Sequence, residues 1–256
     1  MPCRDEIDAL AWLLPRIPTN TEVILCDNGS TDGSPGFAAS WGAKVLVDPA
    51  PRQVGRCVQS GIAAASADVV CVIDCDGTID PRDAVRLAGP IVSGSADFVV
   101  GVRAKEETSR SVRHRLASHL RDALVRRVLP EWPFVDLGSA RAFRRSAFAQ
   151  SDRRPDERFG WNLDVTMCAL EMLDHDRIDS LGIPYRPRIG KSKIADHFFG
   201  SLVAVTDQLR VLQRYLVRKV GGYRLAFDAD ADACKRCSRW AARNASPWVC
   251  SFLGEH

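Results

Sequence analysis

Short apolar runs alternate with helix-like segments along the first part of the chain. Four runs rich in β-branched residues are apolar at consecutive positions, as strands covered on both faces are: 23–26, 44–47, 69–73 and 98–102. Between them, 52–66 and 80–92 are predicted crossover helices, and the second opens with Asp80 as N-cap and Pro81 in its first turn. This alternation predicts an α/β fold with a doubly wound, mostly parallel sheet flanked by helices.

The second half of the chain has weaker landmarks. A basic helical stretch covers about 109–129, an apolar segment follows at 134–143, and 161–173 resembles a helix. Beyond Phe198, apolar residues three and four positions apart predict an amphipathic helix that continues to about Val220. This part of the chain therefore has helical elements with a less regular order.

The periodicity stops after Phe227. We therefore predict one folded domain over 1–227 and a loosely packed tail over 228–256. A chain of 256 residues with 46% hydrophobic composition is long enough to bury the core of one large α/β domain.

Charge and hydropathy exclude several classes of protein. The 35 basic and 32 acidic residues leave a formal net charge of +3, which does not indicate a nucleic-acid partner. No stretch approaches the roughly 20 apolar residues of a membrane-spanning helix, and no signal sequence follows Met1. We expect a cytoplasmic protein.

The nine cysteines do not suggest a disulfide framework. Several lie inside apolar runs, such as Cys26, Cys71 and Cys168, where a reduced thiol packs as a small hydrophobic group. Cys234 and Cys237 form the one CxxC pair in the sequence. A zinc site would need two more ligands at a recognisable spacing, so chance occurrence is the favoured interpretation of this pair.

Two polar clusters follow predicted strands, at 27–34 (DNGSTDGS) and at 74–77 (DCDG). Ligands of such sheets bind outside the carboxyl ends of the strands. Each cluster alone is also typical of an ordinary turn. Their placement at corresponding strand ends of one sheet favours a two-part nucleotide site, in which Asp27 accepts hydrogen bonds from a base or ribose.

Asp74 and Asp76 place two carboxylates one residue apart, and Gly77 allows a sharp turn behind them. Carboxylate oxygens suit Mg²⁺ or Mn²⁺. Such a cation would bridge two phosphate groups and neutralise the charge that develops on a departing nucleoside diphosphate. A solvated turn is the alternative interpretation of this pair.

Five motifs occur in order between residues 2 and 220: PCRDE at 2–6, DNGSTDG at 27–33, DCDG at 74–77, GVR at 101–103 and RPRIGKSK at 186–193. In this order they resemble the landmarks of the family 2 glycosyltransferases of the dolichol-phosphate mannose synthase type. The resemblance implies a GT-A fold. It also implies metal-dependent, inverting transfer of a sugar from a nucleotide-diphosphate sugar to an acceptor such as a polyprenyl phosphate.

The resemblance also assigns roles to residues. The donor-binding residues it implies are Pro2, Arg4, Glu6, Asp27, Asp74, Arg103 and Ser192, and Arg103 would reach either the donor phosphates or the acceptor. The residues it implies for the metal are Asp74, Asp76 and Thr78. Arg188 and Lys193 would act with Asp76 in catalysis, in a loop that closes over the diphosphate and owes its freedom to Gly190. Guanidinium and ammonium groups suit a pyrophosphate, although an exposed basic loop is the alternative.

Two acidic residues are candidates on the acceptor side. Asp136 aligns with an acidic residue that lies near the acceptor in relatives, and Asp164 stands at the start of a helix. One of them would be the general base if the acceptor is a hydroxyl, whereas an ionised acceptor phosphate needs no base.

The densest basic tract comprises Arg110, Arg113, His114, Arg115, Arg121, Arg126 and Arg127. It is either a solvated helix face or a surface for an anionic polyprenyl phosphate and the inner face of the membrane. The amphipathic helix after Phe198 could also lie on that surface, or pack against its own domain.

The chain departs from the resemblance at its start. Relatives have a buried strand just before the first motif, and here Met1 and Pro2 leave no residues for it. We expect a sheet without its first strand, with an exposed edge and a weakened donor site, or a true start upstream of Met1.

Two other functions remain open. A sugar-1-phosphate nucleotidyltransferase would also combine an α/β sheet with metal-binding carboxylates, but would usually carry a Gly-rich phosphate loop near its start, which this sequence lacks. A non-catalytic nucleotide-binding relative would bind a nucleotide without transferring a sugar.

Overall fold

The computed structural model describes residues 1–48, 53–104, 123, 125–127, 129, 133–134, 136–148, 155–190 and 198–229, with side chains in the last range from 203 to 219. The chain forms two compact units, Met1–Val211 and Leu212–His256. The first unit contains every described strand, and the helix α7 (Phe198–Ala229) begins in it. The predicted domain boundary after residue 227 stays a prediction.

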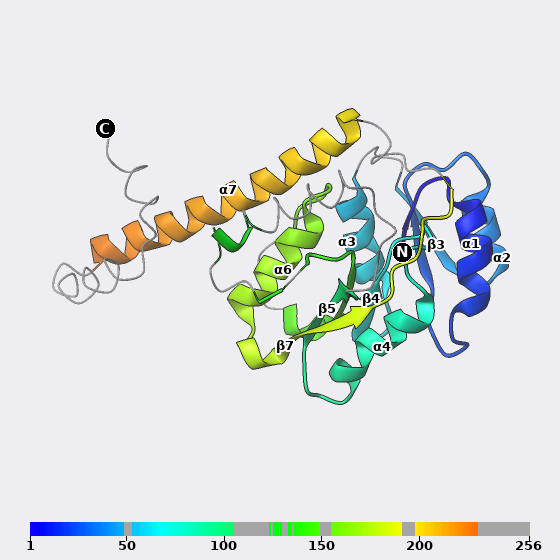
Figure 1. The fold of residues 1–256 in the computed structure, drawn as a ribbon, viewed down its shortest axis with the longest axis horizontal. Coiled ribbons are helices and arrows are strands. Elements are labelled where there is room, and N and C mark those ends of the chain that lie inside the picture. The colour runs from blue at the N-terminus through cyan, green and yellow to red at the C-terminus, as the bar shows by residue number, and fades with distance from the viewer. Residues whose placement is uncertain are drawn as a thin grey trace. The chain divides into compact units, whose positions relative to one another are not determined.

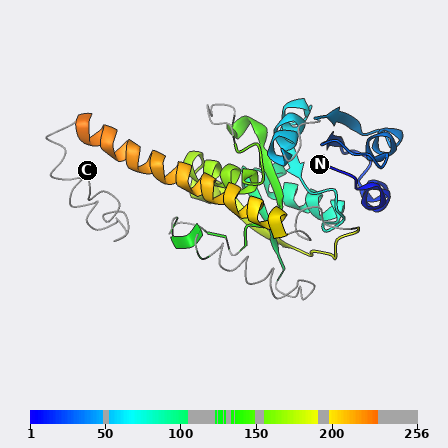
Figure 2. The ribbon, with the colours of Figure 1, turned by 90° about the horizontal axis from the view of Figure 1, so that it is seen from above.

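The first sheet is three-stranded and parallel. Its order is β1 (Pro2–Cys3), β2 (Ile24–Asp27) and β3 (Lys44–Val47). The helices associated with it are α1 (Ile7–Leu13), α2 (Ser34–Ser40) and α3 (Val54–Ala64), where α2 packs against β2 and β3, and α3 packs against β1 and β2. Figure 2 shows α1, α2 and these strands, in blue, together at one end of the unit.

The first strand, which we expected to be missing, is present over two residues. Pro2 pairs with Cys26 and Cys3 with Asp27 in parallel register. The Met1 carbonyl accepts a hydrogen bond from Cys26 N at 2.9 Å, and the Cys3 carbonyl accepts one from Asn28 N at 2.8 Å. The expectation was wrong because it required an apolar run, whereas these few backbone hydrogen bonds are enough to align the chain with β2.

The strand β3 was predicted to be covered on both faces, and this was wrong. Lys44 and Val47 are exposed, Val47 at 67% of its area. The strand lies at the edge of the first sheet, where no further strand pairs with it among the described residues. The apolar composition of β3 therefore reflects a preference for the β conformation and not burial of the strand.

The second sheet has the order β4-β6-β5-β7 and is mixed. It consists of β4 (Val69–Val72), β5 (Phe98–Arg103), β6 (Ala140–Arg144) and β7 (Ile178–Ile183). β5 and β7 are parallel, whereas β6 runs antiparallel to both of its neighbours. The prediction of an α/β fold with a mostly parallel sheet is confirmed, and the apolar segment at 134–143 leads into the one antiparallel strand.

The helix α4 (Pro81–Val92) covers one face of this sheet. It packs against all four strands, and Ile79, Leu87 and Ile91 are fully buried between them. The predicted start is confirmed, because the Asp80 side chain accepts a hydrogen bond from Arg82 N at 3.0 Å and Pro81 opens the helix. In Figure 1, α3 and α6 (Trp161–Met172) lie on the other side of the strands from α4.

Three short 3₁₀ helices complete the described elements, at Leu14–Arg16, Arg145–Phe148 and His175–Arg177. The sequence pattern did not reveal α1, α2 or β7, which are short or mixed in polarity. Most of the basic stretch at 109–129 and the tail beyond 229 lie outside the described residues. The six cysteines in the described part of the chain are reduced, and five of them are buried as predicted, whereas Cys71 is only half-buried. None of the described helices is both long and apolar enough to cross a membrane.

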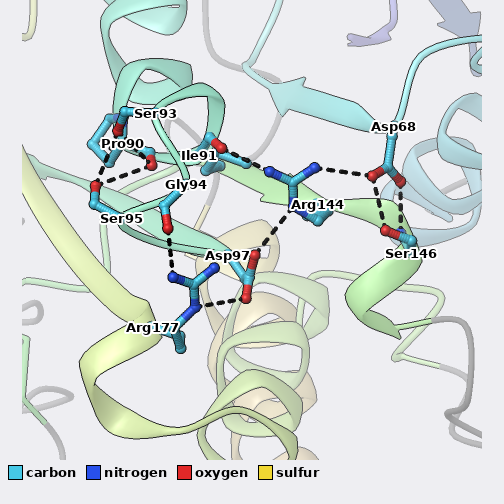
Figure 3. Close-up of polar contacts among 10 residues, drawn as sticks. All are labelled: Asp68, Pro90, Ile91, Ser93, Gly94, Ser95, Asp97, Arg144, Ser146 and Arg177. Carbon is cyan, nitrogen blue, oxygen red and sulfur yellow. Dashed lines mark hydrogen bonds and ion pairs between the residues drawn. The ribbon is translucent and has the colours of Figure 1, made fainter.

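Arginine and aspartate side chains tie the elements together at the start of β5 (Figure 3). Asp97 accepts hydrogen bonds from Arg177 Nε at 3.0 Å and from Arg144 Nε at 3.2 Å. Arg144 also donates to Asp68 and to the Ile91 carbonyl at the end of α4. Asp68 in turn accepts hydrogen bonds from Ser146. Because Asp97 precedes β5, this network lies at the end of the strand opposite Arg103.

Asp97→Asn should destabilise the fold by about 2 kcal/mol at neutral pH, since charge-assisted hydrogen bonds to a half-buried carboxylate are lost. Hydrogen bonds from Arg177 and Arg144 lower the pKa of Asp97 despite its partial burial. The stabilisation is therefore present above the unfolded-state pKa of about 4 and is lost as the pH falls through the lower folded-state value.

Urea denaturation at pH 7 and at pH 3 measures this effect on the free energy of unfolding. The difference between wild type and Asp97→Asn should shrink at pH 3. Asp179→Asn, which removes an exposed carboxylate on β7, is the control and should cost less than about 1 kcal/mol at either pH. An equal deficit of Asp97→Asn at both pH values would contradict the assignment.

Candidate active site

The polar residues predicted from the motifs meet at the carboxyl ends of β1, β4 and β7. Figure 1 shows the yellow segment that follows β7 passing beside the N-terminal residues. Ile189 N in this segment donates a hydrogen bond to the Asp76 carbonyl at 2.9 Å, and Arg186 N donates to the Thr78 carbonyl at 2.8 Å. The last motif therefore lies along the Asp74-to-Thr78 turn, more than 100 residues away in sequence.

The turn after β4 holds Asp76 in one orientation. Its Oδ1 accepts hydrogen bonds from Thr78 N at 3.0 Å and from Thr78 Oγ1 at 2.6 Å. Gly77 has φ +73°, and a Cβ there would lie 2.7 Å from Ile189 Cδ1. The glycine therefore permits both the turn and the close approach of the segment after β7.

Arg188 joins two of the predicted acidic residues. Its Nη1 donates to Asp76 Oδ2 at 2.9 Å, and its Nη2 pairs with Glu6 Oε1. Its Nε is buried and has no hydrogen-bond partner among the described residues. A buried donor without an acceptor is costly, so this guanidinium has capacity for a further anionic ligand.

Asp74 is short of compensating positive charge. Desolvation, together with the negative charge of Asp76, raises the pKa of Asp74 to about 7. A hydrogen bond with Ser139 and the positive charge of Arg188 act in the opposite direction. Two crowded carboxylates of this kind are stabilised when a cation binds between them.

These residues fit Mg²⁺ or Mn²⁺. Nowhere in the described ranges do three or more His, Cys, Asp or Glu side chains converge as a complete metal site. Mg²⁺ does not require one, because it commonly binds through one or two carboxylates together with phosphates of the substrate. Asp74 and Asp76 supply carboxylates and Thr78 supplies a hydroxyl, and burial together with the charge of Asp76 raises the pKa of Asp74.

Asp27 at the end of β2 is almost fully buried, with 2% of its area exposed. Its carboxylate accepts hydrogen bonds from Gly29 N and Ser30 N at 3.1 and 3.0 Å. It therefore shapes the loop after β2, in addition to any contact with a nucleoside. The neighbouring Asn28 donates from Nδ2 to the Asp48 carbonyl at 2.9 Å.

Asp48 was missed by the sequence analysis. It directly follows β3, is buried, and pairs with Arg56 at 2.8 Å. The sequence contains an indication of this residue, because Asp48 directly follows the apolar run at 44–47, much as Asp27 ends the run of β2. Among the other donor candidates, Pro2 lies in β1 and Arg4 is exposed just after it.

A second group of polar residues surrounds Arg103 at the end of β5. Arg103 Nη1 donates to Asp136 Oδ2 at 2.6 Å, and its guanidinium stacks on the Tyr185 ring at 4.3 Å from the centroid. Tyr185 Oη accepts a hydrogen bond from Ser139 N at 2.8 Å. The structure thus brings Arg103 and Asp136 together as an ion pair, and adds Ser139 and Tyr185, which no sequence motif had indicated.

Asp164, Ser192 and Lys193 are the remaining residues that were predicted for the site. Asp164 lies in the first turn of α6, is 4% exposed, and accepts a hydrogen bond from Asp156 N at 2.9 Å. This burial and this contact favour a structural role, and its catalytic role stays a prediction. Ser192 and Lys193 lie outside the described residues, as do Cys234 and Cys237.

Known proteins resemble this chain both in sequence and in fold. Residues 7–151, more than half of the chain, match glycosyl transferase family 2. An uncharacterized glycosyltransferase of Mycobacterium tuberculosis is 32% identical over 224 residues, which cover 83% of this chain and 95% of the relative. A dolichyl-phosphate hexose transferase of Haloferax volcanii is 27% identical over 188 residues, covering 73% and 79% of the two chains.

Among solved structures, glucosyl-3-phosphoglycerate synthase from M. tuberculosis in complex with phosphoglyceric acid aligns with a TM-score of 0.67 at 19% identity, over 83% of this chain and 78% of the synthase. The same synthase with Mn²⁺, uridine-diphosphate-glucose and phosphoglyceric acid aligns with a TM-score of 0.64 at 20% identity over the same shares. These likenesses confirm the GT-A fold. With the sequence matches, they lead to one conclusion: this chain belongs to glycosyl transferase family 2.

Proposed function

We propose that this chain catalyses metal-dependent, inverting transfer of a sugar from a nucleotide-diphosphate sugar to a phosphate-bearing acceptor. The observation that carries the proposal is the position of Arg188 between Glu6 and Asp76, with a buried Nε for which the described residues offer no partner. A guanidinium with spare donors beside two carboxylates is suited to a diphosphate and a cation together.

In this proposal Asp74 and Asp76 hold Mg²⁺ or Mn²⁺, with the Thr78 hydroxyl beside them. The bound cation supplies neutralisation of the charge that develops on the departing diphosphate. Arg188 supplies charge-assisted hydrogen bonds to the same group, and we place Ser192 and Lys193 with it on the basis of the motif they share. The solved synthase that contains Mn²⁺ and uridine-diphosphate-glucose supports a metal-bound nucleotide donor in this fold.

Pro2, Arg4, Glu6 and Asp27 are proposed to line the nucleoside side of the donor. Pro2 begins β1, Arg4 and Glu6 follow this strand, and Asp27 ends β2, its neighbour in the first sheet. Glu6 is tied into place from both sides, since its backbone N donates to Ser34 Oγ at 2.9 Å and its carboxylate pairs with Arg188.

A polyprenyl phosphate is our proposed acceptor. The Haloferax relative is described as a dolichyl-phosphate hexose transferase, and the solved synthase binds phosphoglyceric acid, so a phosphate is common to both. Arg103 would bind the acceptor phosphate by exchanging its present partner Asp136. An ionised phosphate oxygen needs no general base. If the acceptor is a hydroxyl instead, Asp136 is the better placed base, because Asp164 is buried.

With such an acceptor, the transfer reaction would take place at the cytoplasmic face of the inner membrane. Val205 and Leu209, one turn apart on α7, are 48% and 45% exposed, and the next residue, Arg210, is also exposed. Apolar and cationic side chains side by side support peripheral contact with an anionic surface. The proposed contact with the membrane is peripheral.

Thermal unfolding with UDP, GDP and dTDP, each with and without Mn²⁺, tests the donor site. We expect one nucleotide to raise the Tm only when Mn²⁺ is present, because a ligand that binds the native state stabilises it by about 2.7 kcal/mol at 100 times its Kd. Asp76→Asn should abolish the shift.

The control is Asp179→Asn, which removes one carboxylate from an exposed position on β7. It should respond to nucleotide and Mn²⁺ as the wild type does. An absence of any shift in the wild type, or a shift that survives in Asp76→Asn, would contradict the donor site as proposed.

A further inference from the structure

We propose that Trp12, near the end of α1, is a positioning residue for glycosyl transfer, which holds Arg186 and so keeps Arg188 where it meets the donor diphosphate. The inference rests on the proposed function, because that function assigns Arg188 to the diphosphate. Trp12 belongs to none of the motifs that predicted the site. Arg186 lies in the last motif, but no role had been assigned to it.

The segment 186–189 lies between α1 and the turn after β4. On the side of the turn, Arg186 N donates to the Thr78 carbonyl at 2.8 Å, and Ile189 N donates to the Asp76 carbonyl at 2.9 Å. In Figure 1 and in Figure 2 the same segment, in yellow, passes beside α1. Backbone hydrogen bonds therefore fix the segment to the turn, and side chains connect it to the helix.

Two arginines of the segment reach the two ends of α1. At the start of the helix, Arg188 Nη2 pairs with the carboxylate of the N-cap residue Glu6. Near its end, the Arg186 guanidinium lies over the indole ring of Trp12, 4.5 Å from the ring centroid. Glu6 and Trp12 are about 9 Å apart along the helix axis, at 1.5 Å per residue. The segment is thus held at two separate points and cannot pivot about either of them.

Trp12 suits this role because its ring is itself held in place. Arg16 Nη1 donates to the Trp12 carbonyl at 2.6 Å, and the Arg16 guanidinium lies 4.3 Å from the centroid of the same ring. Leu10 and Leu13, on either side of Trp12 in α1, are fully buried. Among aromatic side chains an indole is the strongest partner for a cation, so the exposed Arg186 side chain loses rotamers on a fixed surface.

The expected effect is preorganisation of Arg188. Its guanidinium stands between Asp76 and Glu6, with a buried Nε for which the described residues offer no partner. A long side chain on a loosely held segment loses conformational freedom when a ligand binds, and this loss lowers the affinity. With Arg186 held on Trp12, part of the ordering precedes binding of the diphosphate. The contact should therefore raise the affinity for the nucleotide, and it should act through Arg188.

The test compares Trp12→Leu, Trp12→Phe and Arg186→Ala by isothermal titration calorimetry with Mn²⁺ and whichever of UDP, GDP and dTDP raises the Tm. Trp12→Leu and Arg186→Ala should each weaken nucleotide binding about fivefold, as expected for loss of a cation–π contact at an exposed site. Trp12→Phe, which keeps a ring face, should stay within about twofold of wild type. The Trp12→Leu/Arg186→Ala double variant should bind as either single variant does, because both changes remove the same contact.

Trp41→Leu is the matched control. Trp41 is a half-exposed tryptophan at the end of α2, where it contacts the Phe37 ring. It precedes β3, so it lies at the amino ends of the strands, whereas the site lies at their carboxyl ends. This variant should bind the nucleotide as the wild type does. In an Arg188→Ala background, Trp12→Leu should cause no further loss, since its effect requires Arg188.

Each outcome decides a different statement. Normal nucleotide binding by both Trp12→Leu and Arg186→Ala, with a wild type that binds, would overturn the positioning role and leave the donor site intact. A loss in the double variant that equals the product of the single losses would overturn the connection between the two side chains. A full effect of Trp12→Leu in the Arg188→Ala background would overturn the connection to Arg188. A wild type that binds none of the three nucleotides would overturn the proposed function, and this inference with it.

Discussion

Asp76→Asn is expected to reduce glycosyl transfer about 1,000-fold while the protein remains folded. The carboxylate accepts hydrogen bonds from Thr78 and Arg188, and an amide can keep part of these contacts without the negative charge. Loss of that charge removes a ligand of the proposed cation, and removing one electrostatic contributor to a transition state costs about 10²–10³ or more in rate.

The measurement is release of nucleoside diphosphate, with the nucleotide sugar whose nucleotide gives the Mn²⁺-dependent shift in Tm. Asp179→Asn again serves as the control, because its carboxylate is exposed on β7 and contacts only the neighbouring backbone N of Ser180 in the described structure. Its rate should stay within about twofold of wild type, as for most surface substitutions. Near-normal transfer by Asp76→Asn would refute the metal assignment.

Gly138→Ala should lower the free energy of unfolding by about 3 kcal/mol, because one added methyl group brings both backbone strain and a steric clash. Gly138 has φ +49°, a conformation that costs an alanine strain. Its added Cβ would clash with the Gly101 carbonyl oxygen and lie 3.3 Å from Tyr185 Oη. The Gly101 backbone cannot yield, because Gly101 is paired with Ala140 on one side and Leu181 on the other.

The matched control is Gly36→Ala, at an exposed position of α2. Apart from its chain neighbours and the helix backbone, no atom lies within 4 Å of a Cβ at Gly36, so this change should stabilise the protein by about 1 kcal/mol through helix propensity. Chemical denaturation of the two variants gives opposite signs if the packing argument is correct. Equal stability of Gly138→Ala and wild type would show that the loop before β6 can relax without cost.

Gly138 lies between two residues of the polar group around Arg103. Asp136 pairs with Arg103, a Cβ at Gly138 would meet the Gly101 carbonyl, and Ser139 N donates to Tyr185 Oη. Strain at Gly138 would therefore also displace groups that contact Arg103 and Tyr185, because the segment is densely packed.

The local pattern of residues by itself determined the α/β class, the core strands near Val69 and Phe98, and the start of α4. These elements depend on short-range chemistry: apolar runs form buried strands, and Asp80 with Pro81 starts a helix wherever it lies. The ordered motifs added the family and the GT-A fold through their resemblance to the landmarks of family 2 glycosyltransferases. Short elements such as β1 were not predicted, because two residues are too few to show a periodic pattern.

Contacts between distant segments were decided only by the tertiary structure. Arg188 meets Glu6 across 182 positions and Asp76 across 112, and no local spacing encodes either distance. The antiparallel direction of β6, the exposure of Val47 and the burial of Asp164 follow from sheet order and helix packing. Ser139 and Tyr185 are ordinary residues in sequence, and they became part of the site because β5, β6 and β7 lie side by side. Hydrogen bonds require atoms at about 3 Å, and only the folded chain brings those atoms together.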